Sequence, residues 1–174
     1  MKLPPALLAV TGTLFLAGCQ SSAPLETVEY VDLERFMGEW YVIANIPTFV
    51  EKGAHNAVES YQLDEDGSIA TTFTFRKDGF DGKQKTYEPR GFVVDRDSNA
   101  TWKMQFLWPF KGDYRIIYLE PDYSSTVIGR SKRDYVWLMA RTPEMEPAAY
   151  ERAVQAIRLA GYDTARLQLV PQRW

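Results

Sequence analysis

Short stretches in which apolar and polar residues alternate recur along most of the chain and are separated by turn-forming residues. Alternation with a period of two is typical of β-strands that bury one face. The sequence contains no internal repeat and no low-complexity segment. The pattern predicts eight strands, at Glu39–Ile46, Asn56–Leu63, Ser68–Arg76, Lys83–Asp95, Thr101–Leu107, Tyr114–Glu120, Ser124–Arg130 and Tyr135–Arg141.

The connections between these strands alternate in character. Three are compact turns rich in Asp, Asn, Ser and Gly, at residues 64–67, 96–100 and 121–123. Three others are looser and carry aromatic residues, at residues 47–54, 77–82 and 108–113. Because every second connection of an up-and-down meander lies at the same end, we expect an eight-stranded antiparallel β-barrel with a closed floor and an open mouth.

A helix is predicted after the eighth strand. Pro147 suits a first helical turn, and Tyr150, Val154 and Ile157 form one apolar stripe that ends before Gly161. A helix with a single apolar face should pack on the outside of the barrel. Residues 166–170 alternate again and predict a short ninth strand, so the fold class is all-β with one C-terminal helix.

The N-terminus reads as an export signal. Lys2 precedes an apolar run over residues 6–17, which ends at Gly18-Cys19. A helix of that run is roughly 18 Å long, short of the ~30 Å hydrocarbon core of a bilayer, so a permanent transmembrane anchor is disfavoured.

Leu16-Ala17-Gly18-Cys19 resembles the lipobox of bacterial lipoproteins. The resemblance implies cleavage before Cys19 and attachment of fatty-acyl chains such as palmitate to its thiol. In the Gram-negative system, Gln20 in place of Asp further implies delivery to the outer membrane, with the periplasmic face expected. We therefore divide the chain into a signal peptide (1–18), the lipidated cysteine with a tether (19–29) and a barrel domain (30–174).

Composition narrows the chemistry of the domain. The net charge of −3 and the absence of a basic run disfavour nucleic acid as a partner. Cys19 is the only cysteine and His55 the only histidine, so we expect no disulfide, no metal site and no cofactor. Paired carboxylates occur only in turns such as Asp64-Glu65-Asp66, and we interpret the protein as a non-enzyme.

Three short motifs recur in the order and spacing of a known family. Gly38-Glu39-Trp40 opens the first strand, Asp122-Tyr123 follows the sixth, and Arg141 ends the eighth before Thr142-Pro143. They resemble the conserved regions of the lipocalins over roughly residues 30–170, and with the lipobox the chain is similar to the bacterial outer-membrane lipoprotein lipocalins, relatives of apolipoprotein D. Gly38, Trp40, Asp122, Tyr123 and Arg141 are then structural residues of the floor, where Arg141 can lie over the Trp40 ring.

Alternation assigns side chains to the barrel interior. If Trp40 and Arg141 point inward, residues at even spacing from them do the same, including Ile46 on the first strand. The predicted pocket lining is Val42, Ala44, Tyr61, Phe73, Phe75, Trp102, Met104, Phe106, Tyr114, Ile116, Tyr118, Tyr135, Trp137 and Met139. Such a lining suits an acyl chain, and the alternative is that these side chains simply fill the barrel.

Two features stay open at this point. Glu59 falls on the inward face of its strand, where it departs from the small residue usual in the family; either Arg90 or a ligand group meets it, or the register differs. Aromatic residues at 49, 80, 108 and 110 lie in mouth connections, where they gate ligand entry, contact the membrane, form a homodimer patch or fold back as plugs.

The leading functional interpretation is a membrane-tethered lipid-binding protein that binds, stores or transports fatty acids or lysophospholipids in the cell envelope, as a monomer or homodimer. The alternative is a structural or assembly lipoprotein with a filled barrel that acts through its outer surface.

Overall fold

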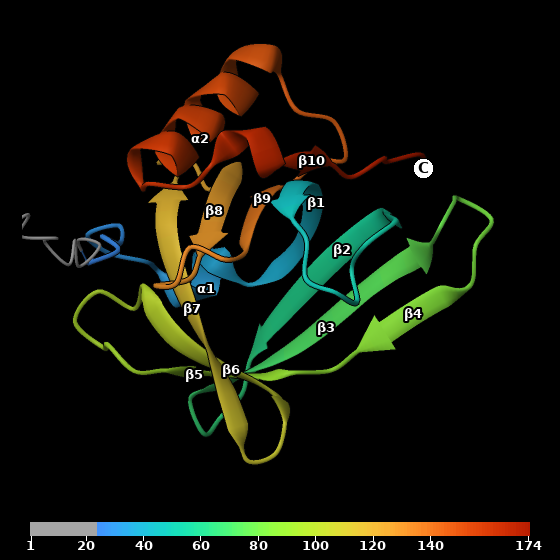
Figure 1. Ribbon diagram of the computed structural model, residues 1–174. Coiled ribbons are helices and arrows are strands. Elements are labelled where there is room, and N and C mark those ends of the chain that lie inside the picture. The colour runs from blue at the N-terminus through green and yellow to red at the C-terminus, as the bar shows by residue number, and fades with distance from the viewer. Residues whose placement is uncertain (1–23) are drawn as a thin grey trace, which may run out of the picture.

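A computed structural model of the chain describes residues 24–174 (Figure 1). The predicted signal peptide and Cys19 lie outside the described residues. Within the described range the strands are β1 (Gly38–Ile46), β2 (Ala54–Leu63), β3 (Ser68–Lys77), β4 (Gln84–Tyr87), β5 (Arg90–Val93), β6 (Thr101–Leu107), β7 (Phe110–Leu119), β8 (Ser125–Gly129), β9 (Val136–Ala140) and β10 (Gln168–Leu169).

The strands form one antiparallel sheet that closes on itself. From β1 to β9 each strand pairs with the next, except that β4 and β5 both pair with β3, and β1 pairs with β9 to complete the circle. Counting β4 and β5 as one interrupted strand, the described residues form the predicted eight-stranded barrel, with β10 added outside it. The predicted fold class is therefore confirmed.

The fourth predicted strand is split in two. Residues 83–95 were expected to be continuous, but β4 ends at Tyr87 and β5 begins at Arg90. Pro89 lies in the gap, and proline has no backbone N–H to donate to a ladder. The Pro89 carbonyl instead accepts a hydrogen bond from the backbone N–H of Thr71, 3.1 Å away.

The connection between β6 and β7 is tight rather than loose. Residues 108–113 were expected to form an open loop, yet β7 starts at Phe110 and pairs with Leu107, so that only Trp108 and Pro109 turn the chain. The prediction was wrong here because the aromatic residues conceal the alternation of a hairpin. Their side chains project from strand ends instead of filling a loop.

Bulges in β1 and β7 correct three inward assignments. Val42 pairs with Met139, but Ala44 pairs with Leu138, so the register shifts by one residue between them. A bulge of one residue moves every later side chain to the opposite face. Ala44 and Ile46 therefore pack outside the barrel, and a second shift after Ile116 does the same to Tyr118.

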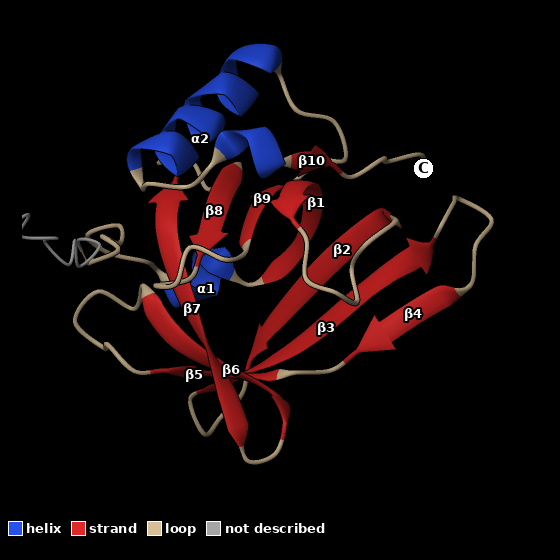
Figure 2. Cartoon of the chain, viewed as in Figure 1, coloured by secondary structure: helices blue, strands red, loops and turns tan. Residues whose placement is uncertain are grey.

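The apolar face created on the outside of the barrel is covered by α2 (Pro147–Leu159). Ala153 and Ile157 are fully buried there, against a cluster that includes Leu138, and Gly161 follows the helix with φ +86°. Figure 2 shows this helix on one side of the molecule, next to β7 and β8, so the predicted helix and its position are confirmed.

A second helix, α1 (Leu33–Phe36), was not predicted because four residues are too few to show a helical period. Its N-cap is Asp32, whose carboxylate accepts a hydrogen bond from the backbone N–H of Arg35 at 3.2 Å. Phe36 is fully buried, with its ring centroid 5.0 Å from that of Trp40. The helix therefore places an aromatic plug under the barrel.

Both ends of the described chain lie against the barrel. Leu25, which the sequence places in the tether, is buried in the cluster under α2 and lies beside Gly129 at the end of β8. At the other end, β10 pairs with Ala44 and Asn45 of β1. The Gln172 side chain then donates to the carbonyls of Val42 (2.8 Å) and Ala57 (3.2 Å), so the tail bridges the two strands where their pairing ends.

Candidate functional site

The barrel floor is held by the residues that the sequence assigned to it. The Arg141 guanidinium lies 3.8 Å from the Trp40 ring centroid and donates hydrogen bonds to the carbonyls of Glu39 (2.9 Å), Arg35 (2.7 Å) and Phe36 (3.1 Å). Gly38 has φ +93°, and an added Cβ would lie 3.4 Å from the Arg141 guanidinium. A side chain at position 38 would therefore strain the backbone and crowd the arginine.

Asp122 and Tyr123 form the neighbouring turn. The Tyr123 hydroxyl accepts a hydrogen bond from the backbone N–H of Asp32 at 2.8 Å, and the Arg35 guanidinium lies 4.0 Å from the Tyr123 ring. Asp122 accepts hydrogen bonds from the Ser124 hydroxyl (2.6 Å) and backbone N–H (2.9 Å), which lower its pKa. These contacts tie the N-terminal helix to the closed end.

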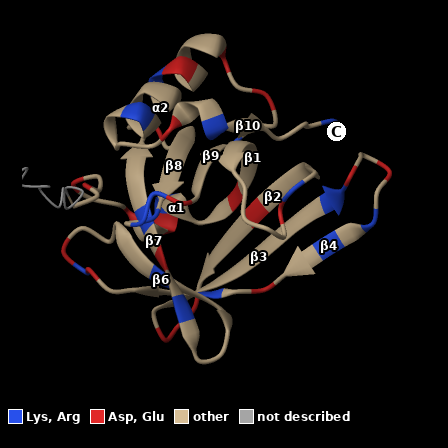
Figure 3. Cartoon of the chain, viewed as in Figure 1, with Lys and Arg blue, Asp and Glu red and all other residues tan. Residues whose placement is uncertain are grey.

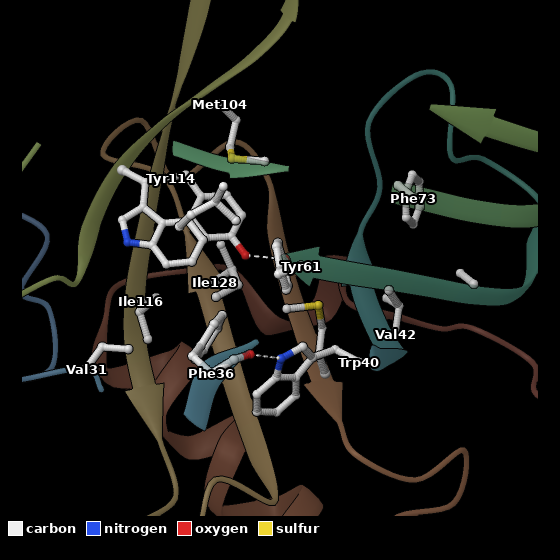
Figure 4. Close-up of a cluster of buried hydrophobic side chains, with 14 of the residues drawn as sticks. Val31, Phe36, Trp40, Val42, Tyr61, Phe73, Met104, Tyr114, Ile116 and Ile128 are labelled. Atoms are coloured by element: carbon white, nitrogen blue, oxygen red, sulfur yellow. Dashed lines mark hydrogen bonds between the residues drawn. The ribbon is translucent and has the colours of Figure 1, made fainter. Parts of the chain in front are cut away.

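Above the floor the barrel core is densely aromatic. The Trp102 and Tyr114 rings stack at 5.2 Å with 10° between their planes, and the Tyr61 and Tyr114 hydroxyls share a hydrogen bond of 2.5 Å. Figure 4 shows Tyr61 and Tyr114 pointing toward each other across the interior. Six residues of the predicted lining belong to this buried cluster and do not border the barrel cavity: Val42, Tyr61, Phe75, Trp102, Ile116 and Met139.

The upper half of the barrel contains a cavity of about 400 Å³. Five residues of the predicted lining border it: Phe73, Met104, Phe106, Tyr114 and Trp137. Tyr135 is half-buried beside Trp137, with ring centroids 6.4 Å apart, and is not among the cavity residues. The interior is therefore part core and part cavity, which combines the two alternatives that the sequence left open.

The cavity also has lining residues that the sequence did not suggest. They are Thr48, Val50, Glu51, Tyr87, Gly112, Asp113 and Arg130. Three of them come from the connection after β1, which has no periodicity to indicate an inward side chain. Glu51 is held there because its carboxylate accepts hydrogen bonds from the Trp137 indole (2.7 Å) and from the Thr48 backbone N–H (2.8 Å).

Glu59 lines the cavity, as expected for an inward-pointing side chain on this strand. It is only 8% exposed, and burial raises its pKa to about 8, with a hydrogen bond from Tyr61 acting in the opposite direction and the negative charge of Glu51 adding to the rise. Arg90 is not its partner; the Arg90 guanidinium binds Asp64 at 2.9 Å and the Ser68 hydroxyl at 2.6 Å. The cavity thus holds a carboxyl group that is mostly protonated at neutral pH.

Arg130 and Asp113 border the cavity close to its mouth. Arg130 follows the last residue of β8 and forms an ion pair with Asp134 at 3.6 Å, while its Nε is buried without a hydrogen-bond partner among the described residues. Asp113 accepts hydrogen bonds from Ser131 at 2.7 and 2.5 Å; partial burial opposes them, but the pKa of Asp113 is lowered. A fixed cation therefore lies where a ligand would enter.

The mouth is bordered by exposed apolar side chains, which we call the rim residues: Phe49, Val50, Phe106, Leu107, Trp108 and Phe110. Phe49 is 83% and Trp108 81% exposed, so they do not fold back as plugs. Phe80 differs from them, because it packs edge-on against His55 at 4.9 Å and under the Arg173 guanidinium at 4.2 Å.

A family model described as a lipocalin-like domain matches residues 31–172, nearly all of the described chain. The chain belongs to the lipocalin family. Lipocalins bind small hydrophobic ligands, and the protein is accordingly a binding protein and not an enzyme, as the sequence indicated. The stacked Arg141 and Trp40 close the floor of this lipocalin.

Curated relatives support the assignment. Temperature-induced lipocalin-1 of Arabidopsis thaliana is 32% identical over 157 residues, covering 85% of this chain and 83% of that protein. Outer membrane lipoprotein Blc of Citrobacter freundii is 29% identical over 175 residues, covering 99% of this chain and 98% of that protein.

Solved structures agree on the fold alone. Apocrustacyanin C2 matches with a TM-score of 0.67 at 15% identity, covering 82% of this lipocalin and 80% of that chain. Insecticyanin from the tobacco hornworm Manduca sexta matches with a TM-score of 0.66 at 13% identity, covering 84% and 83%.

The surface of this lipocalin gives further context. Lys and Arg alternate with Asp and Glu across the strands and helices seen in Figure 3. Residues 24–174 contain no cluster of His, Cys, Asp and Glu suited to a metal ion. None of the helices in that range combines the length and hydropathy needed to cross a bilayer.

Proposed function

We propose that this lipocalin is a tethered carrier that reversibly buries a single-chain lipid, a fatty acid or a lysophospholipid, in the cell envelope. The observation that carries the proposal is the cavity of about 400 Å³, which lies within the range of small-molecule sites and has mostly apolar walls. Transfer of a chain from water to these walls contributes about 0.8 kcal/mol per buried CH₂ group.

An anionic head group would find a partner near the mouth. Arg130 borders the cavity and has a buried Nε that is not used by the described residues. A carboxylate or phosphate oxygen at that position would accept a charge-assisted hydrogen bond, which is stronger than a neutral one. The acyl chain would then extend toward Phe73 and Met104.

We further propose that the protein is anchored to the outer membrane through lipid on Cys19, with the domain in the periplasm. Relatives that span nearly the whole chain are named outer membrane lipoproteins, which supports the location. Leu25 lies beside Gly129 at the mouth end of β8. Five residues separate Leu25 from Cys19, a reach of at most about 20 Å over six Cα–Cα steps, so the mouth would stay close to the bilayer.

The rim residues support direct exchange with a membrane. Several large apolar side chains around one opening are costly in water and are typical of surfaces that contact lipid or protein. Contact with the bilayer would let a lipid enter the cavity without crossing water.

The test is native mass spectrometry of the full-length protein, followed by extraction and identification of any bound lipid. A co-purifying fatty acid or lysophospholipid at one molecule per chain is the expected result. The proposal fails if the protein carries no lipid and also binds none when titrated with palmitate and with a palmitoyl lysophospholipid.

A further inference from the structure

Glu59 is the acidic side chain deepest in the cavity, and its charge is not matched by the protein. On β2 it pairs with Trp40 of β1 on one side and with Phe73 of β3 on the other, so both strand neighbours are aromatic. The Tyr61 hydroxyl is its hydrogen-bond partner, and no Lys or Arg of residues 24–174 forms an ion pair with it. An ionised carboxylate has about four acceptor sites, so most of its capacity is unused.

The other charged groups of the cavity lining are already engaged. Glu51 is bound by the Trp137 indole and the Thr48 backbone, and Asp113 by Ser131 and Arg115. Arg130 is the cation in the lining, and it is paired with Asp134. Glu59 has no basic partner, whereas Arg130 already has an acidic one, so the position beside Glu59 favours a positive group over a negative one.

The inner end of the cavity is polar and its outer end is apolar, which does not suit a ligand that places only its acyl tail at the inner end. The inner end offers the Glu59 carboxyl above the hydroxyl pair of Tyr61 and Tyr114. The outer end offers Val50 and Phe106, which both line the cavity and remain exposed at the mouth. An amphiphile that enters with its polar group first would match both ends.

We propose that Glu59 is a ligand-binding residue that accepts the primary ammonium group of a single-chain amphiphile, whose alkyl or acyl chain runs outward past Phe106 to the rim. The proposal rests on the proposed function, because it requires a cavity that binds single-chain lipids. It adds a cation site at the inner end, separate from the anion position beside Arg130.

Binding at this site releases a proton. In the free protein the Glu59 carboxyl keeps its proton up to a pH of about 8, whereas a primary ammonium keeps its own proton to a pH near 10. Formation of the ammonium–carboxylate pair therefore expels the Glu59 proton to solvent. The groups that face the site are Glu51, Tyr61, Tyr114, Asp113 and Arg130, and the tyrosine pKa values are raised by burial, so they stay neutral.

The experiment is isothermal titration calorimetry of the full-length, delipidated protein with dodecylamine and with dodecanoate. The titration is done at pH 7 in two buffers of different ionisation enthalpy, because the difference in heat gives the number of protons released. Binding of dodecylamine should release close to one proton per molecule bound. As the pH is raised toward about 8, the affinity for dodecylamine should increase by up to about tenfold per pH unit. The affinity for dodecanoate should not increase over this range.

Two variants isolate the carboxyl group. Glu59→Gln keeps the shape of a protonated glutamate. It should lower the affinity for dodecylamine at least tenfold and abolish proton release, and it should leave the affinity for dodecanoate unchanged or increase it. Glu65→Gln makes the same chemical change on an exposed turn and should alter neither ligand. Lysophosphatidylethanolamine in a third arm distinguishes a phospholipid source of the ammonium from a simple long-chain amine.

The outcomes separate this inference from the proposed function. Tight binding of dodecanoate with no binding of either amine, or amine binding that Glu59→Gln leaves unchanged, overturns the role of Glu59 and preserves the carrier. Failure of all three ligands to bind the wild-type protein overturns the carrier itself.

Discussion

The Arg141 guanidinium covers the Trp40 ring at 3.8 Å and so joins the last barrel strand to the first. The same guanidinium donates to carbonyls at the end of α1, which makes it the point where helix, first strand and last strand meet. Residues 24–174 contain no cysteine, so no disulfide within this range joins these elements. The floor therefore depends on the Arg141–Trp40 contact and on the aromatic packing above it.

Replacing Arg141 should destabilise the barrel. Arg141→Ala removes a cation–π contact of about 0.5–2 kcal/mol and leaves backbone carbonyls without partners, so we expect a loss of about 2–4 kcal/mol in the free energy of unfolding. Urea titration followed by tryptophan fluorescence measures it. Arg141→Lys should recover only part of the loss, since lysine lacks the planar fork. An alanine variant as stable as wild type would contradict the role of the floor contact.

Glu59 should make the stability of the ligand-free protein depend on pH. Its pKa is about 8 in the folded state and near 4.5 when exposed, so between those values the folded chain holds a proton that the unfolded chain has lost. Stability from this group is fully present below about pH 4.5 and falls by up to about 1.4 kcal/mol per pH unit as pH rises to 8.

Comparison with Glu59→Gln isolates that contribution. The variant should match wild type near pH 4.5 and exceed it by about 2–4 kcal/mol at pH 8, because glutamine never acquires the buried charge. Urea titrations at a series of pH values give the difference, with Glu65→Gln as the control. Parallel pH profiles for wild type and Glu59→Gln would show that the carboxyl is solvated in the folded protein.

The outer cover of the barrel is tested at Ile157. This side chain is fully buried between α2 and the sheet, so Ile157→Ala should cost about 2–5 kcal/mol through lost transfer energy and the cavity left behind. Leu159, on the same helix, is 78% exposed, and Leu159→Ala should change stability by less than about 0.5 kcal/mol. Similar losses for the two variants in chemical denaturation would mean that α2 does not pack as described.

Most of the fold could be predicted from the sequence because alternation, turn residues and one helical stripe each depend on local chemistry. Predictions failed where the backbone departs from regular pairing. The bulge between Val42 and Ala44 adds one residue to β1 without any signal in the apolar pattern, since Ile43, Ala44 and Ile46 are apolar and buried in either register.

The candidate site was predicted less completely than the fold. Strand residues such as Phe73 and Met104 could be assigned by parity, whereas Glu51 and Arg130 come from connections that have no period. The position of Glu51 depends on a long-range partner, the Trp137 indole, which is known only once the chain is folded. Arg130 pairs with Asp134 in the same β8–β9 connection, and this connection has no apolar pattern that would show which way Arg130 points.

Gly112 offers a direct test of whether the cavity is used. It pairs with Met104, and partners directly opposite each other on neighbouring strands point to the same face, so a side chain at position 112 would enter the cavity. Its φ is not in the left-handed region, and an added Cβ would approach no atom closer than the Met104 carbonyl oxygen at 3.7 Å. A larger residue should therefore fit without strain.

Gly112→Leu should fill part of the cavity and weaken lipid binding at least tenfold while changing the free energy of unfolding by less than about 1 kcal/mol. Gln105→Leu is the matched control: it adds the same side chain one residue after Met104, at a position that does not border the cavity, and should leave lipid affinity unchanged. Titration with a fluorescent fatty acid, alongside urea denaturation, measures both quantities. If Gly112→Leu is folded and inactive in the cell envelope, the cavity serves the function; if it is folded, binds no lipid and remains active, the protein acts through its outer surface instead.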